Sequence, residues 1–175
     1  SFMKIFFLIL SFFLFLGCQH NLEDVQYSYL QSMGDDYAKD IEVNYYLDGK
    51  REFQLTAKEM HQIKEPFEKS VFPKGVSVFV YNNHLDTIAT ILADFAVHDK
   101  KENIVTVERN VELTNLNNEQ LHTERLFWNQ GERTIYTDDF VTINTGKQII
   151  MGYGFVTDQA FTTYSLSDIT GTIYP

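Results

Sequence analysis

An alternation of apolar and other side chains with a period of two runs through most of the chain after its first forty residues. Val43, Tyr45 and Leu47 form one face of such a run, which ends at Asp48-Gly49, and the alternation resumes over residues 53–57. An Asp-Gly pair suits a type I′ hairpin turn, because both central residues of that turn need a positive φ. Successive side chains of a strand point to opposite faces, so the pattern predicts antiparallel strands rather than a helical domain.

The C-terminal half of the chain contains a loose internal repeat with a spacing of 29 to 30 residues. Residues 93–96 align with residues 123–126 and then with residues 152–155. Residues 104–113 align with residues 134–143, and apolar residues occupy matching positions in the two segments. A repeat of this length indicates one supersecondary unit stacked on copies of itself. We therefore expect an all-β fold built from stacked antiparallel hairpins, because one hairpin alone cannot bury its apolar face.

Apolar residues at alternating positions of this repeat are the candidates for the interior of the domain. Core packing explains the residue type at any one of these positions as well as contact with a ligand does. Trp128, the only tryptophan, is expected to pack rather than to stack on a sugar. The interior candidates are Val105, Val107, Val111, Leu113, Leu126, Ile135, Val141, Ile143 and Phe155.

The first twenty residues have the three-part layout of a secretory signal. Lys4 precedes a twelve-residue apolar run that ends at Leu16, and Gly17 then precedes Cys18. As a helix this run would be about 18 Å long, which is short of the ~30 Å hydrocarbon core of a bilayer. We therefore expect a signal peptide over residues 1–17 rather than a permanent transmembrane helix.

The segment from Phe15 to Cys18 resembles a bacterial lipobox, in which a small residue stands directly before the cysteine. Phe15 departs from the usual pattern, where leucine is commoner. Cys18 is the only cysteine, so an intramolecular disulfide is impossible. We expect Cys18 to carry a lipid; the alternative is a buried cysteine at the end of a plain signal or anchor helix. The polar residues 18–40 would then be a lipidated tether, leaving residues 41–175 for the domain.

Charge and motif content argue against several functions. The formal net charge is −10 and no basic stripe is present, so binding to nucleic acid is not expected. The five histidines are scattered, and a single cysteine rules out a zinc ribbon. Asp138-Asp139 is expected to form a bulge or a solvated turn, because adjacent strand residues point to opposite faces. No phosphate-binding loop or nucleophile elbow occurs, so we expect no enzyme, no metal and no cofactor.

An ordered set of segments resembles the LptC family, the periplasmic component of the lipopolysaccharide export machinery. The set comprises residues 121–130, residues 135–138 and the closing stretch over residues 152–173, together with an N-terminal anchoring segment and β-units of about thirty residues. The likeness covers residues 38–175. It implies a twisted β-jellyroll, open along one side, whose interior accepts the acyl chains of lipopolysaccharide through the nine interior candidates.

The resemblance also implies partners and a location. The protein would receive lipopolysaccharide from the inner-membrane ABC transporter complex and pass it to a periplasmic jellyroll bridge protein. It would sit at the periplasmic face of the inner membrane on a lipid anchor, whereas the best-studied members keep a transmembrane helix. The alternative is a structural or ligand-binding envelope lipoprotein without a lipid-transfer role. The edge expected to meet the next jellyroll comprises Ile169, Thr170, Gly171, Thr172, Ile173 and Tyr174.

Overall fold

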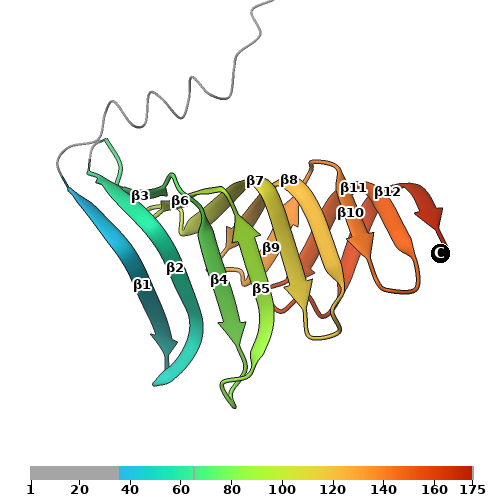
Figure 1. Ribbon diagram of the computed structural model, residues 1–175, viewed down its shortest axis with the longest axis horizontal. Helices are drawn as coiled ribbons and strands as arrows, with labels where there is room; N and C mark the ends of the chain where they lie inside the picture. Colours follow the sequence, from blue (N-terminus) through green and yellow to red (C-terminus); the bar gives the residue numbers. More distant parts are fainter. Residues whose placement is uncertain (1–35, 65, 175) are drawn as a thin grey trace, which may run out of the picture. The chain divides into compact units, whose positions relative to one another are not determined.

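The computed structural model describes residues 36–64 and 66–174, and in that part of the chain all regular elements are β-strands (Figure 1). Every strand pairing is antiparallel, and the twelve strands belong to one sheet. The expected all-β fold is therefore confirmed, and the arrangement matches a β-jellyroll. The strands are β1 (Tyr37–Leu47), β2 (Lys50–Ile63), β3 (Lys69–Phe72), β4 (Val76–Tyr81), β5 (Thr87–Ala93), β6 (Phe95–Asp99), β7 (Ile104–Asn115), β8 (Gln120–Asn129), β9 (Thr134–Thr137), β10 (Val141–Asn144), β11 (Ile149–Asp158) and β12 (Tyr164–Ile173).

The sheet is a meander of long strands, some of which are interrupted at the middle. β3 and β4 are two halves of one such strand, because β2 pairs with both of them. β5 and β6 form another, since both pair with β7, and β9 and β10 form a third, since both pair with β8 and with β11. Each long strand therefore pairs only with the strands before and after it in the chain.

The interruptions lie on one line across the sheet, which we call the fold line. On this line the backbone takes φ values of 49° at Asp40, 86° at Gly75, 49° at Asn110 and 66° at Gly154. Registers also shift near this line, between Glu108 and Val111 in β7 and between Met151 and Gly152 in β11. These left-handed residues and bulges bend the strands that contain them, because they break the regular pleat.

The bends divide the sheet into two walls that lie in two layers (Figure 1). The first wall contains β4, β5 and β10, and the second wall contains β3, β6 and β9; the longer strands contribute one half to each wall. Apolar side chains from both walls belong to one buried cluster between them. Two buried threonines of this core are satisfied locally: Thr123 Oγ1 donates to the Phe140 carbonyl at 2.9 Å and Thr157 Oγ1 to the Thr163 carbonyl at 2.7 Å.

The structure explains the internal repeat. The three aligned segments, residues 93–96, 123–126 and 152–155, all lie at the fold line: between β5 and β6, at the middle of β8 and at the bend of β11. One repeat therefore corresponds to two long strands with the same bend. Asp138-Asp139 likewise lies at the bend between β9 and β10, as expected for a bulge or turn.

The N-terminal hairpin has the turn that the sequence predicts, but its first strand begins earlier than expected. Asp48 and Gly49 have φ values of 50° and 76°, so the predicted type I′ turn is confirmed. β1 begins at Tyr37, however, whereas we expected the tether to continue to residue 40. The strand continues on both sides of Asp40, where it bends at the fold line. This bend interrupts the alternation in the sequence, so the pattern did not reveal residues 37–40 as part of the strand.

We expect the fold line to be intolerant of a side chain at Gly152. A Cβ at this position would lie 2.2 Å from the Asp168 carbonyl oxygen on β12. Gly152→Ala should therefore push β11 and β12 apart and lower the free energy of unfolding by about 1–3 kcal/mol. Thermal unfolding of Gly131→Ala provides the control, because a Cβ there would meet its nearest atom at 3.4 Å. Equal melting temperatures for the two variants would contradict this reading of the bend.

Candidate functional site

The nine apolar residues expected to line the interior all face the space between the two walls. Each is at most 3 % exposed, and all belong to the single buried cluster. Their placement on inner faces is what a lipid-binding interior requires, and it is equally what a packed core requires. Contact with lipopolysaccharide at these residues therefore stays a prediction. Four of them, Val111, Leu113, Val141 and Ile143, lie on the first wall, and Val105, Val107, Leu126, Ile135 and Phe155 lie on the second.

The interior is larger than the nine candidates. It continues toward the N-terminus through Leu55, Val78 and Ile91, which the alternation within β2, β4 and β5 marks in the same way. Phe161 is also fully buried, although it lies in the turn between β11 and β12. No alternating pattern marks a turn residue, so sequence reasoning had no signal for Phe161.

Asp158 organises the turn that carries Phe161. Its carboxylate accepts hydrogen bonds from the backbone N–H of Ala160 at 2.8 Å and of Thr163 at 3.2 Å, and also from the Thr162 hydroxyl. Burial opposes ionisation of Asp158, but these hydrogen bonds outweigh it and lower the pKa of the carboxyl group. The turn thereby holds Phe161 against Phe155, with the two rings 5.7 Å apart.

On the side opposite the fold line, the two walls meet through the ends of different strands. Along this side, which we call the seam, residues of the two walls meet. Phe53 of the first wall packs edge-to-face against Trp128 of the second, with ring centroids 4.8 Å apart. Next to them Arg133 Nη2 lies 3.0 Å from Glu52 Oε1.

A third seam contact lies toward the C-terminus, where Asn115 Nδ2 donates to the Phe161 carbonyl at 2.9 Å. With these contacts in place, the buried side chains of both walls form one cluster between the walls. The Arg133–Glu52 pair is partly exposed. It therefore adds little to the stability of the contact between the walls, because surface ion pairs contribute at most about 1 kcal/mol.

The inner face of the second wall has two rows of different character. Direct cross-strand partners share a face, so the strand registers define these rows. The row nearer the fold line is almost entirely apolar, whereas the row nearer the seam carries several polar groups. The first comprises Met60, Phe72, Ala96, Val107, Leu126, Thr137, Phe155 and Leu166. The second comprises Gln62, Ser70, His98, Val105, Trp128, Ile135, Thr157 and Tyr164.

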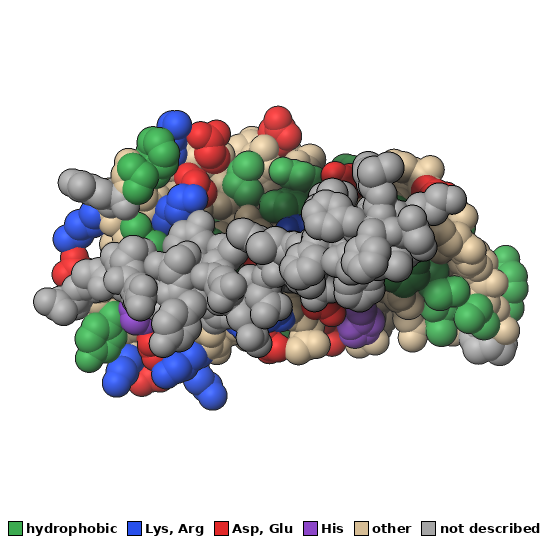
Figure 2. All heavy atoms as spheres, turned by 90° about the horizontal axis from the view of Figure 1, so that it is seen from above, with side chains coloured by type: hydrophobic (Ala, Val, Ile, Leu, Met, Phe, Trp, Pro, Cys, Tyr) green, Lys and Arg blue, Asp and Glu red, His purple; other side chains and the backbone are tan. Residues whose placement is uncertain are grey.

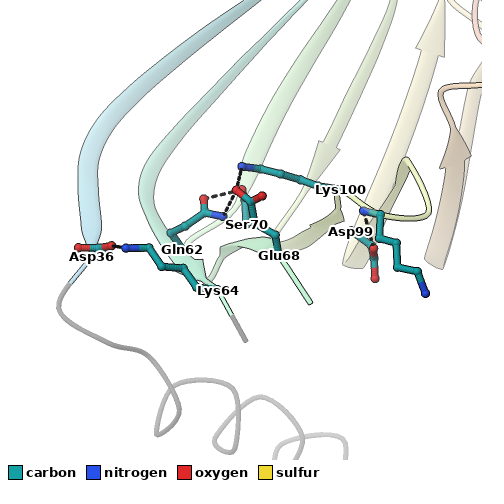
Figure 3. Close-up of polar contacts among 8 residues, drawn as sticks. Asp36, Gln62, Lys64, Glu68, Ser70, Asp99 and Lys100 are labelled. Carbon is teal, nitrogen blue, oxygen red and sulfur yellow. Dashed lines mark hydrogen bonds and ion pairs between the residues drawn. The ribbon is translucent and has the colours of Figure 1, made fainter. Parts of the chain in front are cut away.

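At the N-terminal end of the seam row, polar side chains form a connected network (Figure 3). Ser70 Oγ donates to Gln62 Oε1 at 3.1 Å, and Gln62 Nε2 donates to Glu68 Oε1 at 3.2 Å. Lys100 Nζ lies 2.5 Å from the same carboxylate, and Lys69 pairs with Asp99 at 3.1 Å. Hydrogen bonding by the Glu102 backbone N–H is the main cause that lowers the pKa of Asp99, and burial opposes it.

At the β1–β3 end of the described domain, basic and acidic side chains are paired, whereas the whole chain has an excess of acidic residues. Most of the Lys and Arg side chains that Figure 2 shows lie at this end, with acidic side chains among them. Lys64 pairs with Asp36, and Lys101 lies 3.5 Å from Glu102 and 4.6 Å from the Phe67 ring centroid. The pairing nearly cancels the local charge, although the chain carries −10 overall.

Two buried nitrogen atoms of the seam row have no hydrogen-bond acceptor among the described residues: Trp128 Nε1 and His98 Nε2. Trp128 is only 3 % exposed. Burial, followed by the nearby Lys100, lowers the pKa of His98, and Asp99 and Gln130 only partly oppose this effect. The imidazole is therefore neutral near pH 7.

The two outermost strands of the sheet each have an edge that no described strand covers. On β12, which contains five of the six residues expected at the handover edge, Ile169 is 60 % exposed and Ile173 is 51 % exposed. Tyr174 follows the strand and is exposed as well. An uncovered edge offers N–H and C=O groups to a further strand, which is the geometry that strand addition requires.

The remaining sequence expectations concern metal binding, the acidic pair Asp138-Asp139 and the N-terminal segment. Within the described residues no group of three or more His, Cys, Asp or Glu side chains could hold a metal ion. Asp139 Oδ1 accepts a hydrogen bond from Arg125 Nη2 at 3.2 Å, so this carboxylate has a structural partner. Over the same part of the chain, no helix has the length and hydropathy to cross a bilayer. The signal peptide and Cys18 lie outside the described residues.

Comparison with known proteins gives one family. A family model described as LptC, lipopolysaccharide-assembly, LptC-related, matches residues 5–174, nearly the whole chain. The matched range includes the apolar N-terminal run as well as all twelve strands. Among curated proteins, no match to this chain was found.

Proposed function

The chain belongs to the LptC family, and on this basis we propose that it receives lipopolysaccharide from the inner-membrane ABC transporter and passes it to the next periplasmic jellyroll protein. Membership of the family gives the chain a role in lipopolysaccharide export, in association with the periplasmic side of the inner membrane. The observation that best supports the transfer role is the continuous apolar interior between the two walls.

The interior has the chemistry that acyl chains need. Each methylene group removed from water contributes about 0.8 kcal/mol, so several long acyl chains cannot cross an aqueous compartment unshielded. The nine candidate residues are aliphatic or aromatic, carry no charge and make no directional bonds. Such a surface holds acyl chains by apolar contact alone, and it lets them slide because no position binds one carbon atom more tightly than the next.

We further propose that β12 forms the contact with the next jellyroll. Its outer edge, from Ile169 to Tyr174, would add to an edge strand of the partner, so that the two interiors join into one apolar path. The exposed Ile169 and Ile173 side chains would then become buried at this contact. β1 has an equally free edge at the other end of the sheet, where Tyr37 and Tyr46 are both 59 % exposed, and it would face the transporter side.

Photo-crosslinking in cells tests the interior as the lipid path. With a photoreactive residue at Val107 or Ile143 of the full-length chain, irradiation should give lipopolysaccharide adducts. The matched control is Leu116, which is 62 % exposed and lies in the turn between β7 and β8. A folded, functional protein that gives no adduct at any interior position would overturn the proposal. Depletion that leaves the lipopolysaccharide content of the inner membrane unchanged would instead favour an accessory envelope lipoprotein.

We also propose that Cys18 anchors the protein through a lipid. The support is the lipobox-like segment that precedes it and the absence of any second cysteine to pair with. Cys18→Ala should release the protein from the membrane fraction and abolish incorporation of labelled fatty acid. If the variant stays in the inner-membrane fraction, the apolar run before Cys18 is itself the anchor.

A further inference from the structure

The seam row contains polar side chains, whereas a path that only shields acyl chains would need apolar side chains throughout. The neighbouring row, with residues such as Met60, Phe72 and Leu126, already supplies the apolar wall. The seam row instead places His98 and Trp128 on the same inner face, on either side of Val105. At about 4.8 Å between neighbouring strands, the two residues lie roughly 10 Å apart.

Both residues hold a buried nitrogen atom that no described residue satisfies. Leaving one such group without a partner costs about 1–3 kcal/mol, and buried polar groups are nearly always paired in folded proteins. Phenylalanine or leucine at this position would supply apolar contact without this cost. The other buried polar residues of the inner faces all have a hydrogen-bond partner: Ser70, Asn115, Thr123, Thr137 and Thr157. The two unsatisfied nitrogens are therefore exceptional within this interior.

We propose that the seam row is a hydrogen-bonding subsite for the ester and amide carbonyl groups that join acyl chains to their headgroup, with Trp128 Nε1 and His98 Nε2 as the donors. This inference rests on the proposed function, because it assumes that acyl chains enter the interior. In an acylated amphiphile the linkage carbonyls lie between the polar headgroup and the apolar chains. The seam row lies between the aqueous side of the seam and the apolar row in the same way.

The chemistry of the row favours a carbonyl over a phosphate. Its eight residues include no Lys or Arg, and His98 is neutral near pH 7, so a buried phosphate would lack a counter-charge. A carbonyl oxygen is a neutral acceptor and needs only a donor. The lysines nearest the row, Lys69 and Lys100, already pair with Asp99 and Glu68 outside the interior.

Lipids that differ only in the linkage test the proposal. Titration calorimetry on the purified full-length chain would compare a diester phosphatidylglycerol with its diether analogue of the same chain length, with lipopolysaccharide as the reference. One or two new hydrogen bonds correspond to about 5- to 30-fold tighter binding of the diester. Because Trp128 is the only tryptophan, its fluorescence should also respond more to the diester than to the diether.

Trp128→Phe keeps an aromatic ring and removes the donor. The variant should lose part of the preference for the diester, because one of the two donors is removed and His98 Nε2 remains. Tyr136→Phe is the matched control, since it also removes one polar atom from a ring, and Tyr136 stacks on Phe127 on the outer face. It should keep the preference of the wild type.

The outcomes separate the two proposals. Equal affinity of the wild type for diester and diether, with lipopolysaccharide still bound, overturns the subsite and leaves the proposed function standing. Failure of the wild type to bind lipopolysaccharide overturns both. Because the diester-to-diether ratio of the wild type is itself decisive, the test does not depend on the folding of any variant.

Discussion

Phe161→Ala is expected to lower the free energy of unfolding by about 3–5 kcal/mol, the range for removing a fully buried aromatic side chain. Phe161 is 0 % exposed and packs against Phe155 and Tyr164, with ring centroids 5.7 Å and 5.2 Å away. Truncation would leave a cavity between the walls at the C-terminal end. The backbone contact of Asn115 with residue 161 would also weaken, because the ring no longer holds the turn in place.

Denaturant unfolding measures this loss, and Phe140→Ala is the matched control. Phe140 is also a phenylalanine outside a strand and also packs edge-to-face on another ring, Tyr153, but it is 43 % exposed. Its truncation should cost no more than about 1 kcal/mol. If the two variants lose the same stability, the turn between β11 and β12 is not part of the core.

The contrast between Phe161 and Ile143 shows what the sequence can predict. Ile143 stands in an alternating run, and the period of two assigned both its strand and its inner face. Phe161 stands in a turn at a positive φ of 53°, where an L-residue is rare. Its position is set by Asp158 and by burial against residues distant in the chain. Such contacts leave no local pattern, so the sequence could not reveal them.

The sequence did not reveal the fold line either, because the bulge in β7 depends on the pairing of two strands. In β7 the inward residues Val107 and Val111 are both odd-numbered, so the alternation appears to continue unbroken through Arg109 and Asn110. The pairing with β8 shows that one extra residue lies there, since Glu108 pairs with Arg125 and Val111 with Thr123. A bulge is a property of two strands together, and the sequence of one strand does not contain it.

The seam is the least predictable part of the candidate site. Glu52 and Arg133 lie on opposite walls, and only the bend at the fold line and the twist of the sheet bring them together. The repeat indicated how neighbouring strands stack, but it held no information on which strand ends meet after folding. Trp128 was expected to pack, and it does; its contact with Phe53 across the seam could not be foreseen.

Locking the seam is expected to weaken the binding of lipopolysaccharide strongly. Glu52→Cys with Arg133→Cys, in a full-length Cys18→Ser background, allows a short bismaleimide to join the walls where the native ion pair lies. The interior residues are then held at their closed positions, at most a few per cent exposed, and acyl chains find no room between them. We expect binding to fall at least about tenfold on bridging, because a chain that cannot be buried loses about 0.8 kcal/mol for each methylene group.

A bridge within one wall is the control for the chemical treatment. His122→Cys with Thr142→Cys joins direct cross-strand partners of β8 and β10 in the first wall, away from the seam. Bridging this pair should leave binding unchanged, since the two strands do not separate when the walls part. Full binding by the seam-bridged protein would show that the seam stays closed during loading. Acyl chains would then have to enter at the end of the sheet, past β1 or β12, where the outer strand edges are free of strand partners in the described domain.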